Sequence, residues 1–257
     1  MPLTTWPAVA FIVLPVALAV LLAAGTAAAW ARSGQPWPRT RRATLVTMVL
    51  TVMWMEATWM AAANGVLRQW NRTPPPFALF VLAILAIAAG IVFSPYGRRL
   101  AATLPVWLLV LVQAFRFPLE LAMHGMYEHG VMPVQMSYSG RNFDIVTGVT
   151  ALVVARFTAS GRAGARLVLA WNVLGLLLLA NVVTVAILST PPIAYFGPER
   201  LNVWVTYPPY VWLPAVLVLA ALAGHLLIFR ALRLQHAGRP RWRDPRERTL
   251  PPPVPTT

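Results

Sequence analysis

The chain has 257 residues, of which 58% are hydrophobic and 11% are charged. Soluble domains usually carry about 25% charged residues, so this composition argues against a soluble protein. Cysteine is absent, which excludes a disulfide framework and any thiolate nucleophile or thiolate metal site.

All 21 basic residues are arginine, and the formal net charge is +14. A seven-helix retinal protein needs a lysine for its Schiff base, so the absence of lysine excludes retinal as a cofactor. The arginines flank apolar segments and form no separate basic domain. They therefore predict contacts with anionic lipid headgroups at an inner membrane face, and no nucleic-acid partner.

Seven segments are candidates for membrane-spanning helices, each of which needs about 20 mostly apolar residues. In chain order they are residues 6–30, 44–65, 77–94, 100–123, 143–157, 167–189 and 210–229. The first has no basic region before it, and its apolar run is too long for a signal peptide, so we expect an anchor. The sequence thus predicts an all-α bundle of seven transmembrane helices over residues 1–233.

The arginine distribution predicts the orientation of this bundle. With the N-terminus outside and the C-terminus inside, sixteen arginines fall on the inner side and four on the outer side. The positive-inside rule predicts this asymmetry. Without the short span 143–157, the seven arginines from residue 230 onward would lie outside, so the rule also supports seven spans. Residues 234–257, rich in Arg and Pro, are expected to form a disordered cytoplasmic tail.

Acidic residues are concentrated toward the opposite side. Two of the seven lie in the tail, and the other five fall in the outer half of the membrane or on the outer surface: Glu56, Glu120, Glu128, Asp144 and Glu199. This polarity places any polar site on the outer side.

The fourth predicted span carries the most polar residues. Its members recur at spacings of 3, 4 and 4, which put them on one helical face: Gln113, Arg116, Glu120 and His124. Arg116 and Glu120 can then pair directly, and Glu56 is at a compatible depth as a second partner. Charges within the membrane cost about 2.5–3.5 kcal/mol each and face the bundle interior. The group is either an interhelical clamp that fixes packing or a pocket open to the outer face.

A metal site is a further hypothesis for this region. Glu120, His124, His129 and Asp144 offer oxygen and imidazole ligands suited to zinc or a similar divalent ion. Their spacing matches no compact ligand motif. In the alternative, Asn142 caps the helix that follows, and Asp144 lies in its first turn near the positive end of the helix dipole.

His225 is predicted near the inner interface, about 20 Å deeper than His124 at a rise of about 1.5 Å per residue. The two histidines would then be too far apart to ligate one haem, so we expect no haem. We expect His225 to form hydrogen bonds within the bundle or near the headgroups.

Several segments resemble a family of uncharacterised bacterial multi-pass membrane proteins. They are Phe-Arg-Phe-Pro-Leu-Glu at 115–120, Gly-Arg-Asn-Phe-Asp at 140–144, Trp171-Asn172, and Trp-Leu-Pro at 212–214 with His225. The resemblance covers roughly residues 100–233. It implies a bacterial cytoplasmic (inner) membrane and carries no activity.

Three functional hypotheses follow. The leading one is a non-catalytic membrane protein, meaning a ligand-binding, sensory or accessory subunit with partner membrane subunits. The alternative is a metal-dependent hydrolase at the outer face, with Glu120, His124 and Asp144 as ligands or base. The third is a small-solute or proton-coupled transporter that uses Arg116 and Glu120.

Overall fold

The structure is a computed structural model that describes residues 5–237. This part of the chain is helical and contains no strand, which confirms the all-α prediction. The last helix continues to residue 237, so most of the predicted tail lies outside the described residues.

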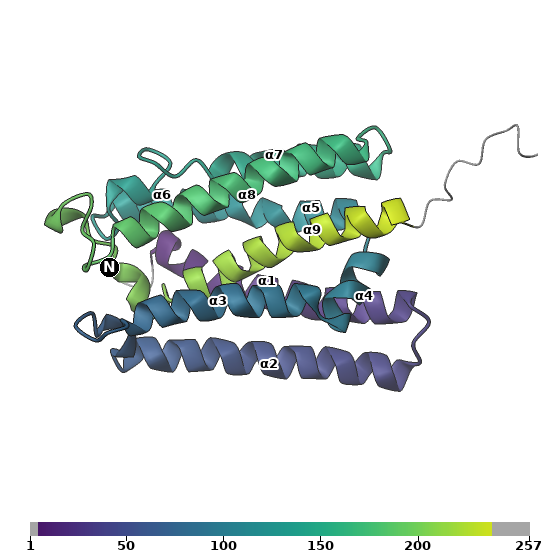
Figure 1. Ribbon diagram of the computed structural model, residues 1–257, viewed down its shortest axis with the longest axis horizontal. Coiled ribbons are helices and arrows are strands. Elements are labelled where there is room, and N and C mark those ends of the chain that lie inside the picture. The colour runs from purple at the N-terminus through teal and green to yellow at the C-terminus, as the bar shows by residue number, and fades with distance from the viewer. Residues whose placement is uncertain (1–4, 238–257) are drawn as a thin grey trace, which may run out of the picture.

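The long helices lie side by side along the longest axis of the molecule (Figure 1). In chain order the α-helices are α1 Trp6–Arg32, α2 Trp37–Ala63, α3 Pro76–Phe93, α4 Pro95–Thr103, α5 Val106–Val112, α6 Arg116–Glu128, α7 Ile145–Ala159, α8 Ala165–Leu188 and α9 Leu219–Ala237. A 3-10 turn, Gln113–Phe115, joins α5 to α6, and a π-helical segment, Leu213–Val218, leads into α9.

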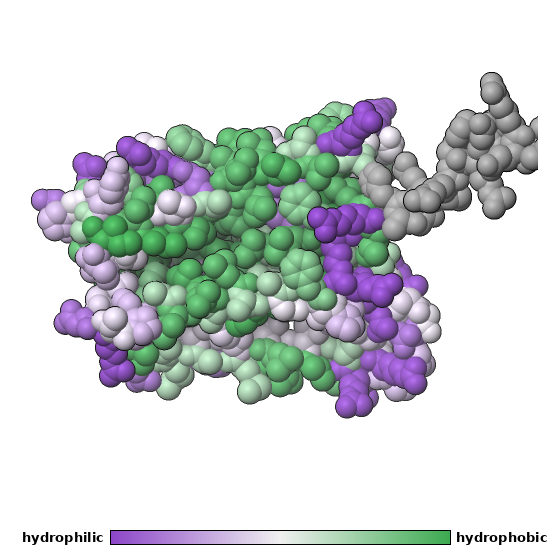
Figure 2. Space-filling view, in the orientation of Figure 1, coloured by the Kyte–Doolittle hydropathy of each residue, from purple (hydrophilic) through white to green (hydrophobic). Residues whose placement is uncertain are grey.

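Six helices of the described chain are long and apolar enough to cross a membrane. They are Trp6–Arg32, Trp37–Ala63, Pro76–Phe93, Val106–Glu128, Ala165–Leu188 and Leu213–Leu234. The remaining predicted span corresponds to α7, a shorter apolar helix of 15 residues that packs against α6 and α8. Figure 2 shows the matching surface, with a broad apolar band between two ends where hydrophilic residues gather.

The fourth predicted span, residues 100–123, is displaced in the structure, where the span runs over Val106–Glu128. Leu104 has an extended backbone (ψ 136°) because the residue before a proline is disfavoured in the α conformation. Pro105 therefore separates the short helix α4 from α5. The Ser94 side chain caps α4 by accepting a hydrogen bond from the Gly97 N–H.

Two of the spans are irregular near a proline. Pro118 has no N–H to donate, and its ring crowds the carbonyl four residues earlier, which accounts for the 3-10 turn Gln113–Phe115. Pro214 lies within the π-helical segment Leu213–Val218, where the regular α-helical hydrogen bonds of the backbone are likewise interrupted. The 3-10 turn contains the buried Gln113 and directly precedes Arg116, and the π-helical segment lies in the same span as His225.

Glycines allow the helices around these polar residues to approach closely. A Cβ on Gly148 of α7 would collide with the backbone nitrogen of Phe117 in α6. A Cβ on Gly175 of α8 would lie 2.6 Å from Cε1 of His225 in α9. Small residues at such crossings are typical of helix packing in membranes, where close backbone contact replaces the hydrophobic effect.

Candidate functional site: a buried polar cluster

Seven polar side chains from three helical spans and the loop before α7 are buried at the centre of the bundle. We call them the buried polar cluster: Gln113, Arg116, Glu120, Asn142, Asp144, Asn172 and His225. Each is between 0% and 4% exposed. Arg116 is the eleventh residue of the span Val106–Glu128, so the cluster lies near mid-span, deeper than the sequence suggested.

Arg116 joins three elements of the bundle. Its Nη2 forms an ion pair with Oδ2 of Asp144 at 2.8 Å, and its Nη1 donates to Nε2 of His225 at 2.8 Å. The predicted direct pair between Arg116 and Glu120 is therefore wrong. The carboxylate that reaches the guanidinium comes from the start of α7, and Glu120 is engaged elsewhere.

His225 must be neutral in this arrangement. Arginine can only donate, so Nε2 of His225 accepts and the ring hydrogen resides on Nδ1. Nδ1 then donates to Oδ1 of Asn172 at 2.8 Å, and Asn172 Nδ2 donates to the His225 carbonyl oxygen at 3.0 Å. The expectation that His225 forms hydrogen bonds within the bundle is confirmed, but its placement near the inner interface is wrong. The span starts at Leu213, so His225 is its thirteenth residue and lies near mid-span.

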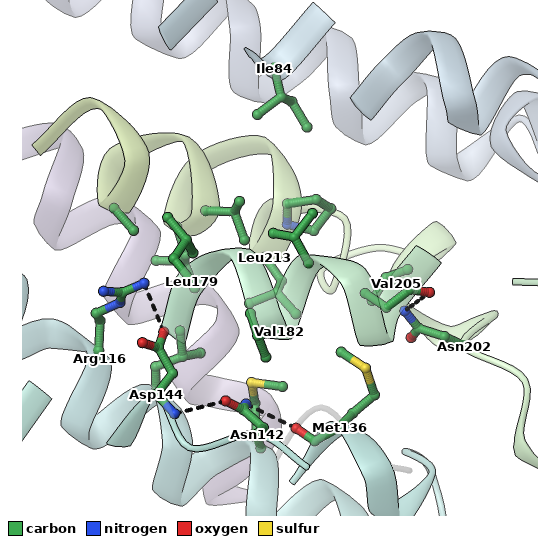
Figure 3. A pocket seen from close by; sticks show the side chains of 18 of the residues that line it. Ile84, Arg116, Met136, Asn142, Asp144, Leu179, Val182, Asn202, Val205 and Leu213 are labelled. Atoms are coloured by element: carbon green, nitrogen blue, oxygen red, sulfur yellow. Dashed lines mark hydrogen bonds and ion pairs between the residues drawn. The ribbon is translucent and has the colours of Figure 1, made fainter. Parts of the chain in front are cut away.

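Asn142 is hydrogen-bonded to both acidic residues of the cluster, and Figure 3 shows its contacts with Asp144 and Met136. Its Nδ2 donates to Oε2 of Glu120 at 2.8 Å and to the Met136 carbonyl oxygen at 3.0 Å. Its Oδ1 accepts from the Asp144 N–H at 3.0 Å. The predicted capping role of Asn142 is wrong, since α7 begins at Ile145 after Asp144 and has no side-chain cap.

The cluster holds two carboxyl groups and one guanidinium. Asp144 takes the ion pair with Arg116, whereas Glu120 has an amide partner and no basic group of its own. His225 adds no charge, because its ring accepts from Arg116. An ionised Glu120 would thus be an uncompensated buried charge, which is costly inside a membrane.

A cavity of about 90 Å³ adjoins the acidic side of the cluster. It lies between α3 and α8, both of which pack on α9, and reaches from Arg116, Glu120 and Asp144 toward Asn202 in the loop after α8 (Figure 3). Asp144 Oδ1 and Asn202 Oδ1 are buried without a hydrogen-bond partner among the described residues. A water needs about 10–15 Å³ of such volume, so the cavity admits several waters or one small solute.

Gln113 is buried one helical turn before Arg116 and has an amide oxygen without a hydrogen-bond partner among the described residues. Its Nε2 donates to the Ala221 carbonyl oxygen at 3.3 Å. The Gln113 amide packs directly on Gly224 of α9, because a Cβ on Gly224 would collide with the amide nitrogen.

His124 and His129 lie outside the cluster. His124 stacks on Tyr138 with ring centroids 4.3 Å apart, and its Nδ1 is 2.9 Å from Ser137 Oγ. Nδ1 of His129 donates a hydrogen bond to the Gly125 carbonyl oxygen at 2.7 Å. The predicted metal ligands are therefore divided between the interior, with Glu120 and Asp144, and the surface of the protein, with His124 and His129. Over residues 5–237, no three His, Asp or Glu side chains are grouped to hold a metal ion.

Glu56 also stays apart from the cluster. Its side chain lies on the exposed face of α2, a helix at the edge of the bundle that packs mainly on α1. The predicted pairing of Glu56 with Arg116 is therefore wrong, because compatible depth in the membrane does not bring two helices together.

Sequence reasoning left Asn172 and His225 out of the candidate site, although both join the cluster. Each is a polar residue in an otherwise apolar span, which is itself a signal for a site inside a membrane protein. Their connection to Arg116 depends on which helices are neighbours, and spacing along one helix does not give that.

Comparisons with known proteins support one part of the resemblance, that to an uncharacterised family. No curated protein and no solved structure matches the chain. A family model described as "Domain of unknown function (DUF8737)" matches residues 73–233. The match runs from the loop before α3 into α9 and includes the whole buried polar cluster. The chain therefore belongs to this family of unknown function.

Proposed function

We propose that the protein is a non-catalytic membrane protein that binds a small cationic solute at the buried polar cluster. The observation that carries this proposal is the imbalance of two buried carboxyl groups against one guanidinium, at the wall of a cavity. A cation there would compensate Glu120, and Asp144 Oδ1 and Asn202 Oδ1 would supply acceptors.

The proposed setting is a bacterial cytoplasmic membrane crossed seven times, with the N-terminus outside. Described arginines outnumber acidic residues at the end that carries the α1–α2 turn, α4, the α7–α8 turn and the end of α9. Glu128 and Glu199 lie toward the opposite end. Counting α7 as the seventh span puts all of these arginine-bearing segments on the inner side, as the positive-inside rule requires.

Transport of the same solute, or of a proton, is the second candidate. It is favoured by the irregular segments that precede Arg116 and His225, namely the 3-10 turn Gln113–Phe115 and the π-helical segment Leu213–Val218. Secondary transporters bind their substrates near mid-membrane, at interrupted helices. Interrupted helix segments of this kind are also common at functional hinges.

The proposal is tested by thermal unfolding of the purified full chain in mild detergent. Ammonium, methylammonium, ethanolamine, choline, sodium and potassium are each added at matched ionic strength. We expect at least one of them to raise the Tm of the wild type and to leave Glu120→Gln unchanged. This variant keeps an acceptor for Asn142, so its fold should survive.

Glu128→Gln is the matched control, since Glu128 is exposed on the outer surface and 62% of its side chain is accessible. It should respond to the cations as the wild type does. If no cation shifts the Tm and Glu120→Gln unfolds at a lower temperature than the wild type, the cluster is a structural clamp and the proposal fails.

A further inference from the structure

A second and much larger cavity lies beside α2 and is lined by residues of six helices. This chamber has a volume of about 1030 Å³, at the upper end of the roughly 300–1,000 Å³ typical of small-molecule sites. Its wall comes from α1 and α2 on one side and from α3, α4, α5 and α9 on the other. Most of that wall is apolar, with residues such as Leu22, Leu50, Ile91, Leu109 and Leu227.

α2 packs along α1, and its contacts with the rest of the bundle lie toward its C-terminal half. There, Trp54 Nε1 donates to the Ala215 carbonyl oxygen at 2.8 Å, and Trp212 Nε1 donates to the Met55 carbonyl oxygen at 3.1 Å. Before Met55, the only buried residue of α2 is Thr40. Figure 1 shows α2 as the outermost helix on its side of the bundle. A chamber of this size with a mostly apolar wall is large enough to hold a ligand.

One end of the chamber is basic. Arg39 and Arg42 are three residues apart on the chamber-lining face of α2, and Arg99 of α4 lines the chamber as well. The Arg99 guanidinium lies 4.5 Å above the Trp30 ring, which holds it at the rim. Among the described residues that line the chamber, none is acidic. Arg39 and Arg42 lie near the start of α2 and Arg99 lies in α4, and Figure 2 shows hydrophilic residues gathered at each end of the molecule.

We propose that the chamber binds one anionic diacyl phospholipid of the surrounding bilayer. Its acyl chains lie between α2 and α9, and its phosphate lies at Arg39, Arg42 and Arg99. The apolar wall matches the chains, and the arginines match a phosphate, for which arginine is a preferred partner. This site is separate from the buried polar cluster and does not depend on the proposed cation.

Native mass spectrometry of the full chain in mild detergent tests the proposal. Dioleoyl phosphatidylglycerol is the probe, dioleoyl phosphatidylcholine the zwitterionic comparison, and glycerol 1-phosphate the free headgroup. We expect one phosphatidylglycerol per chain, retained at least about fivefold better than phosphatidylcholine. Glycerol 1-phosphate should not displace it, because the chains hold the lipid in place.

Neighbouring arginines supply matched controls. Arg42→Gln and Arg99→Gln should each weaken phosphatidylglycerol binding about fivefold. Arg41→Gln and Arg98→Gln carry the same change in net charge but do not line the chamber, and they should bind as the wild type does.

A further variant tests the chamber itself, independently of the arginines. Gly90 of α3 lines the chamber and has open space where a Cβ would be, so Gly90→Phe should occupy part of the chamber and reduce the binding of both lipids. Equal retention of the two lipids would overturn the proposal. Equal losses in Arg41→Gln and Arg42→Gln, or displacement by glycerol 1-phosphate, would overturn it as well.

Discussion

At the scale of single residues, the account depends on which acidic residue Arg116 pairs with. Spacing along one helix favours Glu120, four residues on, but the ion pair is formed with Asp144 from the start of α7. Asn142 donates a hydrogen bond to Glu120 instead, so the two carboxyl groups have different surroundings. Removing each carboxyl group should therefore lower the free energy of unfolding by a different amount.

Asp144→Ala should destabilise the protein more than Glu120→Ala. Loss of Asp144 leaves Arg116 buried without an ionic partner, a loss of about 3 kcal/mol or more in the free energy of unfolding. Loss of Glu120 removes one of the two acceptors of the Asn142 amide, at a cost of about 1 kcal/mol. Unfolding by SDS titration in mixed micelles measures both, with Glu128→Ala as the exposed control. A larger loss for Glu120→Ala would show that Arg116 depends on Glu120 after all.

At the scale of helices, apolar composition predicted the approximate positions of the long helices. Proline and glycine determine where individual helices start, become irregular or pack closely. Hydropathy located the spans, because each must be apolar over its length. It could not predict the start at Val106, where Pro105 ends α4, or the irregular segments beside Arg116 and His225. Nor could it predict which helices touch at Gly148 and Gly175, because contact between helices is a property of the folded bundle.

Gly148→Ala should weaken the packing of α7 against α6. The added methyl group would collide with backbone atoms of Phe117, which cannot rotate away, so the helices must separate at a cost of about 1–3 kcal/mol. Gly90→Ala is the control, since its Cβ would meet open space and helix propensity favours alanine by about 1 kcal/mol. Equal stabilities of the two variants, measured by the same SDS titration, would argue against close contact at Gly148.

At the scale of the whole molecule, the sequence predicted a helical bundle with arginines concentrated at one end, and the structure agrees. The number of spans depends on α7, whose 15 residues are fewer than the usual 20. The candidate site could be predicted only in part. Gln113, Arg116, Glu120, Asn142 and Asp144 were named. His225, which contacts Arg116, and Asn172, which contacts His225, come from helices whose neighbours the sequence does not specify.

Cysteine labelling decides whether α7 crosses the membrane. The chain has no cysteine, so single substitutions are read without background. Ser139→Cys and Ser160→Cys flank α7. In intact cells, a membrane-impermeant maleimide should label the first and not the second, whereas permeabilised cells should show both labelled. Labelling of both in intact cells would place the two ends of α7 on the same side and remove the seventh span.

In the proposed cation site, Glu120 is the carboxyl group that the bound cation compensates. The most direct measurement is equilibrium dialysis of the purified chain with the radiolabelled cation that raises the Tm most, comparing wild type, Glu120→Gln and Glu128→Gln. The account predicts about one cation bound per chain in the wild type and in Glu128→Gln, and none in Glu120→Gln. Equal binding by all three proteins would contradict it and move the site away from the buried polar cluster.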